Sequence, residues 1–425
     1  MSLLIQSFVA FFRSPLTTLF LGVQILALGL LLWLIRAGRL RVPHILAISV
    51  VWWAALSFWF IPQGFNYSIY RYNATLTLAG KPAFARPVAS DSDVQHEPYT
   101  QPLYLDYTGA QHLLYVLMTA LSYGSTHLRL MGIGFQVWSF VTGGVLLWLL
   151  VLYGRSKTGQ NDVLVAVPLV VLVFHPIFSL HWLIYSWEDK VIFALIPLAL
   201  VVCIRQRWLT AAALSVGCIL SLNGFVVFWL PACVWYLYLH YGFKRQFFQL
   251  ILWIGLGAAL CLVPFFPDSL SGWVYRAARM SAPTPFWFSI YLLLPPGFYH
   301  PLLDKAIVGT LALGSTWLYW RRRVSLTDML VVAISLTVMF GPYNGVSRVL
   351  PVLFAIMVLT PQVSFHDWIW FCGVISLYFF VSLGFTPANI QTIHVAVFYA
   401  PVVWVMGMYF FKRRQGNRAE VTLSF

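Results

Sequence analysis

The sequence predicts an all-α, polytopic transmembrane helical bundle of about 11–13 spans, and three observations lead to this fold class. The chain of 425 residues is 60% hydrophobic and only 9% charged, whereas soluble domains carry roughly 25% charged residues. Apolar runs long enough to cross a bilayer follow one another with short loops between them. Lys and Arg cluster at the ends of these runs, which is typical of cytoplasmic loops. One membrane domain over residues 1–425 is the simplest organisation.

The net charge of +14 comes from 26 Lys and Arg against 12 Asp and Glu. Because the basic residues lie at span ends, the positive-inside rule accounts for them, and no nucleic-acid partner is expected. Anionic membrane lipids are the natural neighbours of such clusters. The five cysteines all lie in apolar runs and form no C-x-x-C pair, so we interpret them as small core residues.

The first half of the chain begins with a span at 16–35 that ends in the basic sequence RAGRLR. A second span at 43–61 then delivers residues 63–107 to the opposite, extracytoplasmic side. Segment 108–123 is short and is expected to be an interfacial or re-entrant helix. Further spans are expected at 131–153, at 163–180, in a segment that ends at Arg205, at 208–222 and at 224–241.

The second half of the chain continues the same alternation towards a basic tail, 412–425, that is predicted to be cytoplasmic. Segment 285–300, like segment 108–123, is expected to enter the membrane without crossing it fully. Full spans are expected at 246–266, 303–320, 327–342, 348–360, 367–384 and 391–411. About thirteen crossings result, with the N-terminus outside and the C-terminus inside. Whether segments 108–123 and 285–300 cross the membrane decides if the number of crossings is odd or even.

The polar stretch 63–107 is the longest non-hydrophobic run in the chain, and it is expected to carry short interfacial helices. It holds four of the 12 acidic residues: Asp91, Asp93, Glu97 and Asp106. Asp106 directly precedes a hydrophobic segment and is followed by Tyr107, a setting in which a carboxylate can act as a base or orient a hydroxyl. The alternatives are a helix cap for Asp106 and a solvated loop tip for the Ser-Asp-Ser-Asp sequence that contains Asp91 and Asp93.

Two further polar clusters fall on the same predicted side. Glu188 and Asp189 open a span within Trp-Glu-Asp-Lys, where charges are costly and often functional, although an interfacial anchor is the alternative. Arg348 lies at the edge of a late span, where its guanidinium suits a phosphate or simply snorkels to the interface. Arg276 and Arg279, one helical turn apart, also lie on the outer side, against the positive-inside rule.

Four stretches, in this order along residues 60–360, together resemble the GT-C class of integral-membrane glycosyltransferases, and its mannosyltransferase-like families in particular. YSIYRYNATLTLAGKPAF, which contains Tyr70, is similar to their first-loop pattern, and YLDYTGAQHLLYVLMTAL to their entry into the following helix, with Thr108 and Gly109 in place of a proline pair. WEDKVIFALIPLALVVCIRQRWLTAAALSVG resembles their next landmark, and SRVLPVLFAI their late Arg-x-Leu-x-Pro helix.

The resemblance implies transfer of a mannose-like hexose or a pentose from a polyprenyl-phosphate donor to a lipid-linked or envelope glycan acceptor at the outer membrane face. A carboxylate would accept the proton of the acceptor hydroxyl, and cations would hold the donor phosphate. In these families the first loop begins with an acidic residue, but Asn66 takes its place here, so Asp91, Asp93, Asp106 or Glu188 is left as the base. The expected location is a prokaryotic plasma membrane.

The sequence contains no P-loop, no G-x-G-x-x-G, no H-E-x-x-H and no His and Cys set for a metal. A divalent cation could assist transfer, but no ligand set demands one. Three alternatives stay open: a transporter or flippase of lipid-linked glycans, a polysaccharide polymerase or ligase, and a catalytically inactive relative, which Asn66 motivates. A transporter would predict charges at span centres, and a polymerase a large late loop, and the sequence favours neither.

Overall fold

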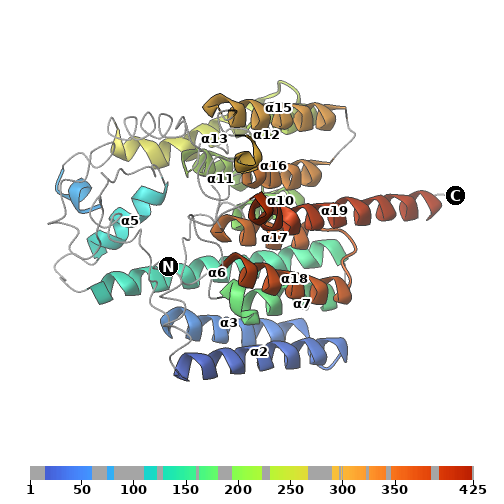
Figure 1. Cartoon of the computed structure of the whole chain (residues 1–425). Helices are drawn as coiled ribbons and strands as arrows, with labels where there is room; N and C mark the ends of the chain where they lie inside the picture. The colour runs from blue at the N-terminus through green and yellow to red at the C-terminus, as the bar shows by residue number, and fades with distance from the viewer. Residues whose placement is uncertain are drawn as a thin grey trace.

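The computed structural model is all-helical throughout its described part (Figure 1). It describes residues 15–59, 74–80, 110–121, 128–158, 162–179, 194–222, 230–266, 290–295, 298, 300–321, 325–340, 346–383 and 392–423. Three helices are long and apolar enough to cross a membrane: Leu19–Arg36, Arg245–Phe265 and Val395–Gln415. Their length and composition indicate a membrane protein.

The helices of the first half are α2 (Pro15–Arg36), α3 (Val42–Trp59), α5 (Ala110–Leu121), α6 (Leu128–Thr158), α7 (Asp162–Phe174), α10 (Ile196–Arg205), α11 (Leu209–Leu222) and α12 (Leu230–Tyr241). Those of the second half are α13 (Arg245–Leu262), η3 (Val263–Phe265), η4 (Ile290–Leu293), α15 (Pro301–Trp320), α16 (Leu326–Phe340), α17 (Val346–Leu359), α18 (Phe365–Leu383) and α19 (Thr392–Leu423). Each span expected from the sequence coincides with a helix over most of its described length, and segment 108–123 forms the short helix α5.

The bundle buries its central helices completely and leaves apolar side chains on its outer ones. Every residue of α17 from Val349 onward is buried, as are residues 165–174 of α7. On outer helices the pattern is reversed, and Leu26 on α2, Leu252 on α13 and Trp370 on α18 are each more than 70% exposed. Large apolar side chains pointing away from the core are what a lipid environment favours and water does not.

The tightest helix packing joins α11 to α13. Gly217 and Gly257 face each other there, and a methyl group at either would overlap backbone atoms of the other helix. Small residues let two backbones approach in this way, which is a common means of helix association in membranes.

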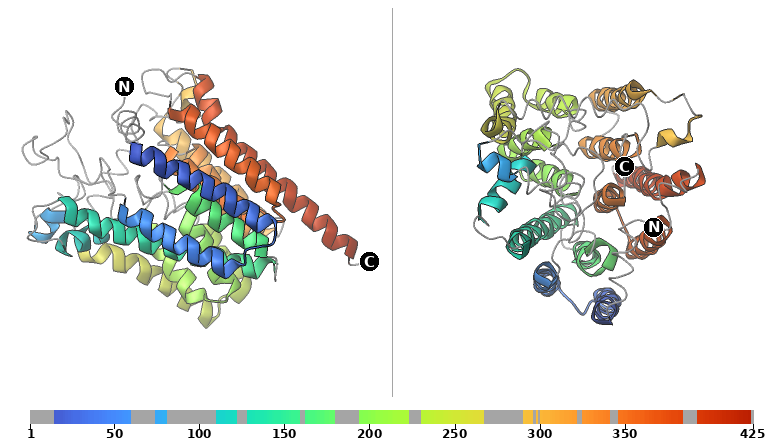
Figure 2. Two further views of the ribbon diagram at one scale, coloured as in Figure 1. Left: turned by 90° about the horizontal axis from the view of Figure 1, so that it is seen from below. Right: turned by 60° about the vertical axis from the view of Figure 1, so that its left-hand side comes forward.

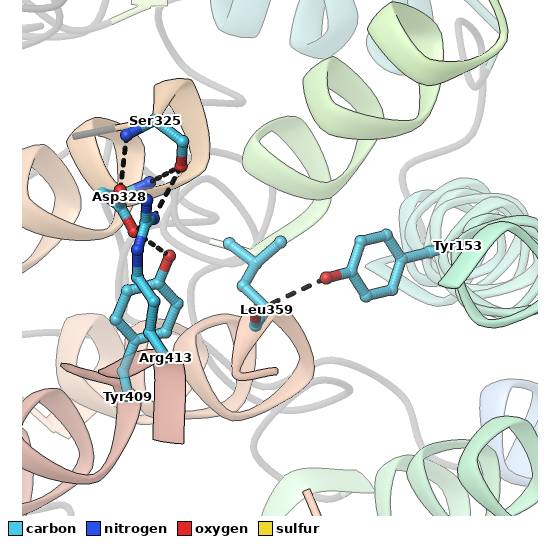
Figure 3. Close-up of polar contacts among 6 residues, drawn as sticks. All are labelled: Tyr153, Ser325, Asp328, Leu359, Tyr409 and Arg413. Carbon is cyan, nitrogen blue, oxygen red and sulfur yellow. Dashed lines mark hydrogen bonds and ion pairs between the residues drawn. The ribbon is translucent and has the colours of Figure 1, made fainter. Parts of the chain in front are cut away.

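The described short connections that carry Lys or Arg lie at one end of the bundle, together with the connection between α17 and α18, and we call this the basic end. It comprises residues 36–42, 155–158, 205–209, 241–245, 320–321, 325–326 and 359–365, with Lys412–Arg414 of α19. Contacts tie its parts together: the Arg36 guanidinium lies 5.8 Å from the Phe365 ring, and the Tyr153 hydroxyl donates to the Leu359 carbonyl at 3.4 Å (Figure 3). Figure 1 shows α5 at the opposite end of the bundle.

Helix α19 differs from its expected form because it does not stop at the end of the apolar run. It continues to Leu423, and Figure 1 and the left view of Figure 2 show its C-terminal part projecting beyond the basic end. Lys, Arg, Gln, Ala and Glu after residue 411 are good helix formers, so the turn-by-turn hydrogen bonds continue through the basic segment. The predicted tail 412–425 is therefore helical as far as Leu423.

Candidate functional site

The residues predicted to act in catalysis or binding fall almost entirely outside the described part of the chain. Arg348 is the exception, since its backbone belongs to the first turn of α17. The predictions that lie outside are Asn66, Tyr70, Asp91, Asp93, Asp106, Tyr107, Glu188, Asp189, Arg276 and Arg279. Their roles therefore stay predictions, and the described helices around them define where the candidate site would be.

The described piece of the polar stretch contacts α5, and α5 in turn contacts η3, which follows α13. Residues 74–78 form a helical turn, and the Thr77 hydroxyl lies 2.8 Å from Nε2 of His112 on α5. The His112 ring meets Phe265 edge to face, with ring centroids 4.7 Å apart. Segments from three separate parts of the sequence therefore meet at the end of the bundle opposite the basic end.

Burial makes His112 an uncharged hydrogen-bonding residue. Removal of the ring from water lowers the pKa of His112 to about 4, because the imidazolium is disfavoured in a low-dielectric setting. At neutral pH the ring can exchange a hydrogen bond with Thr77 but cannot serve as a cation for a phosphate. Its position suits support of the loop that follows residue 78, not direct binding of an anion.

Helices α10 and α17 both run towards the basic end. The C-terminus of α10 lies at the basic end, where Arg205 donates to Ser156 at 3.1 Å, and the C-terminus of α17 lies there too, where Leu359 meets Tyr153. The start of each helix must therefore point the other way. Arg348 lies in the first turn of α17, which points away from the basic end, and α10 follows in sequence the segment that contains Glu188.

A polar break inside α7 was not anticipated from the sequence. The helix is interrupted at His175, before Pro176, which has no amide hydrogen. Gln24 on α2 donates to the Val173 carbonyl at 3.2 Å and to the Ser179 hydroxyl. The His-Pro dipeptide in an otherwise apolar run was the available signal for this break.

The imidazole at this break is also buried and faces α18. Nε2 of His175 lies 3.4 Å from the Cys372 carbonyl and 3.3 Å from the Ser376 hydroxyl. Among the described residues its Nδ1 has no hydrogen-bond partner. Polar groups buried inside apolar helices are often functional, but these contacts join the segment after α7 to α18, and we assign His175 a structural role.

Within the described residues no three His, Cys, Asp or Glu side chains come close enough together to hold a metal ion. The acidic residues of the polar stretch lie outside that part, so an assisting divalent cation stays a prediction. Searches against protein-family models, curated proteins and solved structures find no match to this chain. The functional argument therefore rests on the sequence motifs and the arrangement of the helices.

Proposed function

We propose that the chain is a multi-pass membrane glycosyltransferase. It moves a mannose-like hexose or a pentose from a polyprenyl-phosphate donor to a lipid-linked or envelope glycan acceptor on the outer face of a prokaryotic plasma membrane. The ordered motifs that resemble the GT-C class motivate the activity. One structural observation supports the location: residues 74–80 and α5 lie at the end opposite the basic end, and α10 and α17 both start on their side that points away from the basic end.

The basic end supplies the orientation. Under the positive-inside rule it faces the cytoplasm, so the opposite end faces outward. The polar stretch would then meet the donor, whose sugar is presented at the outer surface. This side needs no nucleotide site, because the donor's phosphate is already a good leaving group.

Arg348 and Asp106 take different parts in the proposed reaction. Arg348 binds the donor phosphate with its planar guanidinium, which can hold two phosphate oxygens at once. The positive end of the α17 dipole adds to this attraction. Asp106 orients the acceptor hydroxyl or takes its proton. The hydroxyl oxygen then forms the new bond to the sugar while the polyprenyl phosphate leaves.

The proposal predicts separable kinetic effects of two substitutions. Loss of a charge-assisted hydrogen bond costs about 1.5–3 kcal/mol, so Arg348→Ala should weaken donor use roughly ten- to a hundredfold, with partial recovery in Arg348→Lys. Asp106→Asn keeps the shape and removes the charge, so it should lower turnover with little change in donor binding. Two assays measure these effects: binding of a polyprenyl-phosphate sugar, and the rate at which its radiolabelled sugar is transferred.

Arg414→Ala, an exposed cation at the basic end, is the matched control and should change neither quantity. Normal transfer by Asp106→Asn would move the base to Glu188, and normal donor binding by Arg348→Ala would move the phosphate to Arg276 or Arg279. A wild-type chain that binds the donor without transferring sugar would instead be the inactive relative that Asn66 suggests.

A further inference from the structure

A cluster of arginines and tryptophans lies at the basic end, far from the proposed catalytic face. It consists of Trp148 and Arg155 on α6, with Arg205, Arg207 and Trp208 at the turn between α10 and α11. We call these five residues the Trp–Arg patch. All five side chains are exposed.

The two tryptophans form a flat apolar surface on the outside of the bundle. Trp148 and Trp208 stack with ring centroids 6.0 Å apart and an interplanar angle of 16°. They are 50% and 44% exposed, so each keeps a face available to the surroundings. Tryptophan favours the boundary between hydrocarbon and headgroups, where its apolar ring and its N–H are both accommodated.

The arginines lie on the polar side of this pair. Arg155 follows Trp148 by seven residues, which is two helical turns, so both lie on the same side of α6. Arg205 is fixed close by, because its Nη1 donates to the Ser156 hydroxyl at 3.1 Å and its guanidinium lies 4.9 Å from the Tyr153 ring. Arg207 occupies the turn itself, with φ of 60°.

These three positive charges have no carboxylate partner among the described side chains. The ion pairs of that part of the chain join Asp367 to Lys412 and Asp328 to Arg413, so both of these carboxylates pair with α19 and not with the patch. Three guanidinium groups held together without counter-charge repel one another. An anion bound between them would remove that repulsion and gain charge-assisted hydrogen bonds.

We propose that the Trp–Arg patch is a specific binding site for an anionic phospholipid of the cytoplasmic leaflet. Arg155, Arg205 and Arg207 hold the headgroup phosphate, and an acyl chain runs along Trp148 and Trp208. The stacked tryptophans favour a lipid over a soluble phosphate, because a free ion would make no use of an apolar surface. The proposal rests on the membrane placement proposed above and is independent of the glycosyl-transfer activity.

The test uses the full chain purified in detergent, with native mass spectrometry of bound phosphatidylglycerol against phosphatidylcholine. The principal variant is Arg155→Gln/Arg207→Gln, which leaves the Arg205–Ser156 hydrogen bond in place. The matched control is Lys244→Gln/Arg245→Gln, which removes two exposed cations at the start of α13. The patch variant should bind phosphatidylglycerol about tenfold or more weakly, with phosphatidylcholine unchanged, whereas the control should keep wild-type affinity.

Two further measurements separate the sources of the phosphate. Trp148→Leu should also weaken phosphatidylglycerol binding, and millimolar inorganic phosphate should not displace the lipid. The proposal is overturned if the Lys244 and Arg245 control loses binding equally, since the effect would then be general surface charge. It is also overturned if inorganic phosphate competes fully and Trp148→Leu binds normally, since the site would then take a soluble anion.

Discussion

Helices α16 and α18 begin with the same motif but use it differently. Each starts at a Ser-x-x-Asp sequence, Ser325 to Asp328 and Ser364 to Asp367. In both, the Asp amide donates to the Ser hydroxyl at 3.2 Å and the Asp carboxylate accepts from the Ser amide. These reciprocal bonds form a capping box, which satisfies backbone donors that a helix start leaves unpaired.

Burial distinguishes the two boxes. The Asp328 side chain is 1% exposed, whereas that of Asp367 is 21% exposed. Asp328 accepts from the Tyr409 hydroxyl at 2.7 Å and is paired with Arg413, which also donates to Ser325 at 2.8 Å (Figure 3). Asp367 is paired with Lys412 alone, at 2.9 Å.

The difference shows how one local motif can become part of the tertiary structure. At α18 the box is mainly a helix cap, with a partly exposed ion pair added to it. At α16 it is the anchor of α19, because a buried carboxylate that lost its cation would remain uncompensated. Adjacent residues of α19, Lys412 and Arg413, thus connect it to two neighbouring helices with unequal strength.

The largest expected effect is therefore at Arg413. Arg413→Ala leaves Asp328 buried without its cation and should lower the free energy of unfolding by about 3–5 kcal/mol. Thermal unfolding in detergent, monitored as the loss of monodispersity, measures the shift in the unfolding midpoint. The matched control is Lys412→Ala, which removes the partly exposed ion pair with Asp367 and should cost at most about 1 kcal/mol.

If Arg413→Ala and Lys412→Ala were equally mild, burial would not decide the strength of the two pairs. A double variant, Arg413→Ala with Asp328→Asn, distinguishes the pair from the packing. It should recover part of the loss, because the uncompensated charge is gone while the amide can still accept the capping hydrogen bond.

An intermediate effect is expected at Tyr409, which donates the remaining hydrogen bond to the buried carboxylate. Tyr409→Phe keeps the ring and removes only the hydroxyl, so it isolates that bond. Hydrogen bonds to charged groups contribute about 1.5–3 kcal/mol, and a decrease of this size in the unfolding free energy is the expected outcome. The same detergent unfolding measurement applies, and an unchanged midpoint would mean that Arg413 alone compensates Asp328.

Most of the helices could be predicted from the sequence, because apolar runs inside a bilayer must satisfy their own backbone hydrogen bonds. The span expected at 303–320 is the helix Pro301–Trp320. The partners of Lys412 and Arg413 could not be predicted. They lie 45 and 85 residues away in sequence, from Asp367 to Lys412 and from Asp328 to Arg413, and no local pattern encodes such contacts.

For the candidate site, the residue types could be read from the sequence but their arrangement could not. Its residues were selected by charge type and motif order, which a sequence displays directly. Their convergence depends on loop conformation, and the residues concerned, Asp106 and Glu188 among them, lie outside the described part. The contact between His112 and Thr77 was missed because a lone histidine in the apolar segment 108–123 carries no signal of its partner.

The smallest expected effect is the pH dependence of the capping box at α18, which contains the partly exposed Asp367. Partial burial acts to raise the pKa of Asp367, but hydrogen bonds from Ser364 and Lys412 and the Lys412 charge outweigh it, so the pKa lies below its ordinary value. A carboxylate with a lowered pKa in the folded state stabilises the fold above its unfolded pKa of about 3.9. This contribution is lost as the pH falls through the folded pKa. Asp367→Asn keeps a capping acceptor but cannot titrate, so the wild-type chain should lose more unfolding free energy than this variant between about pH 5 and pH 3, by at most about 1 kcal/mol. Other carboxylates titrate in both proteins and cancel in the difference. Identical acid profiles would mean that the charge of Asp367, and with it the Lys412 pair, contributes nothing to stability.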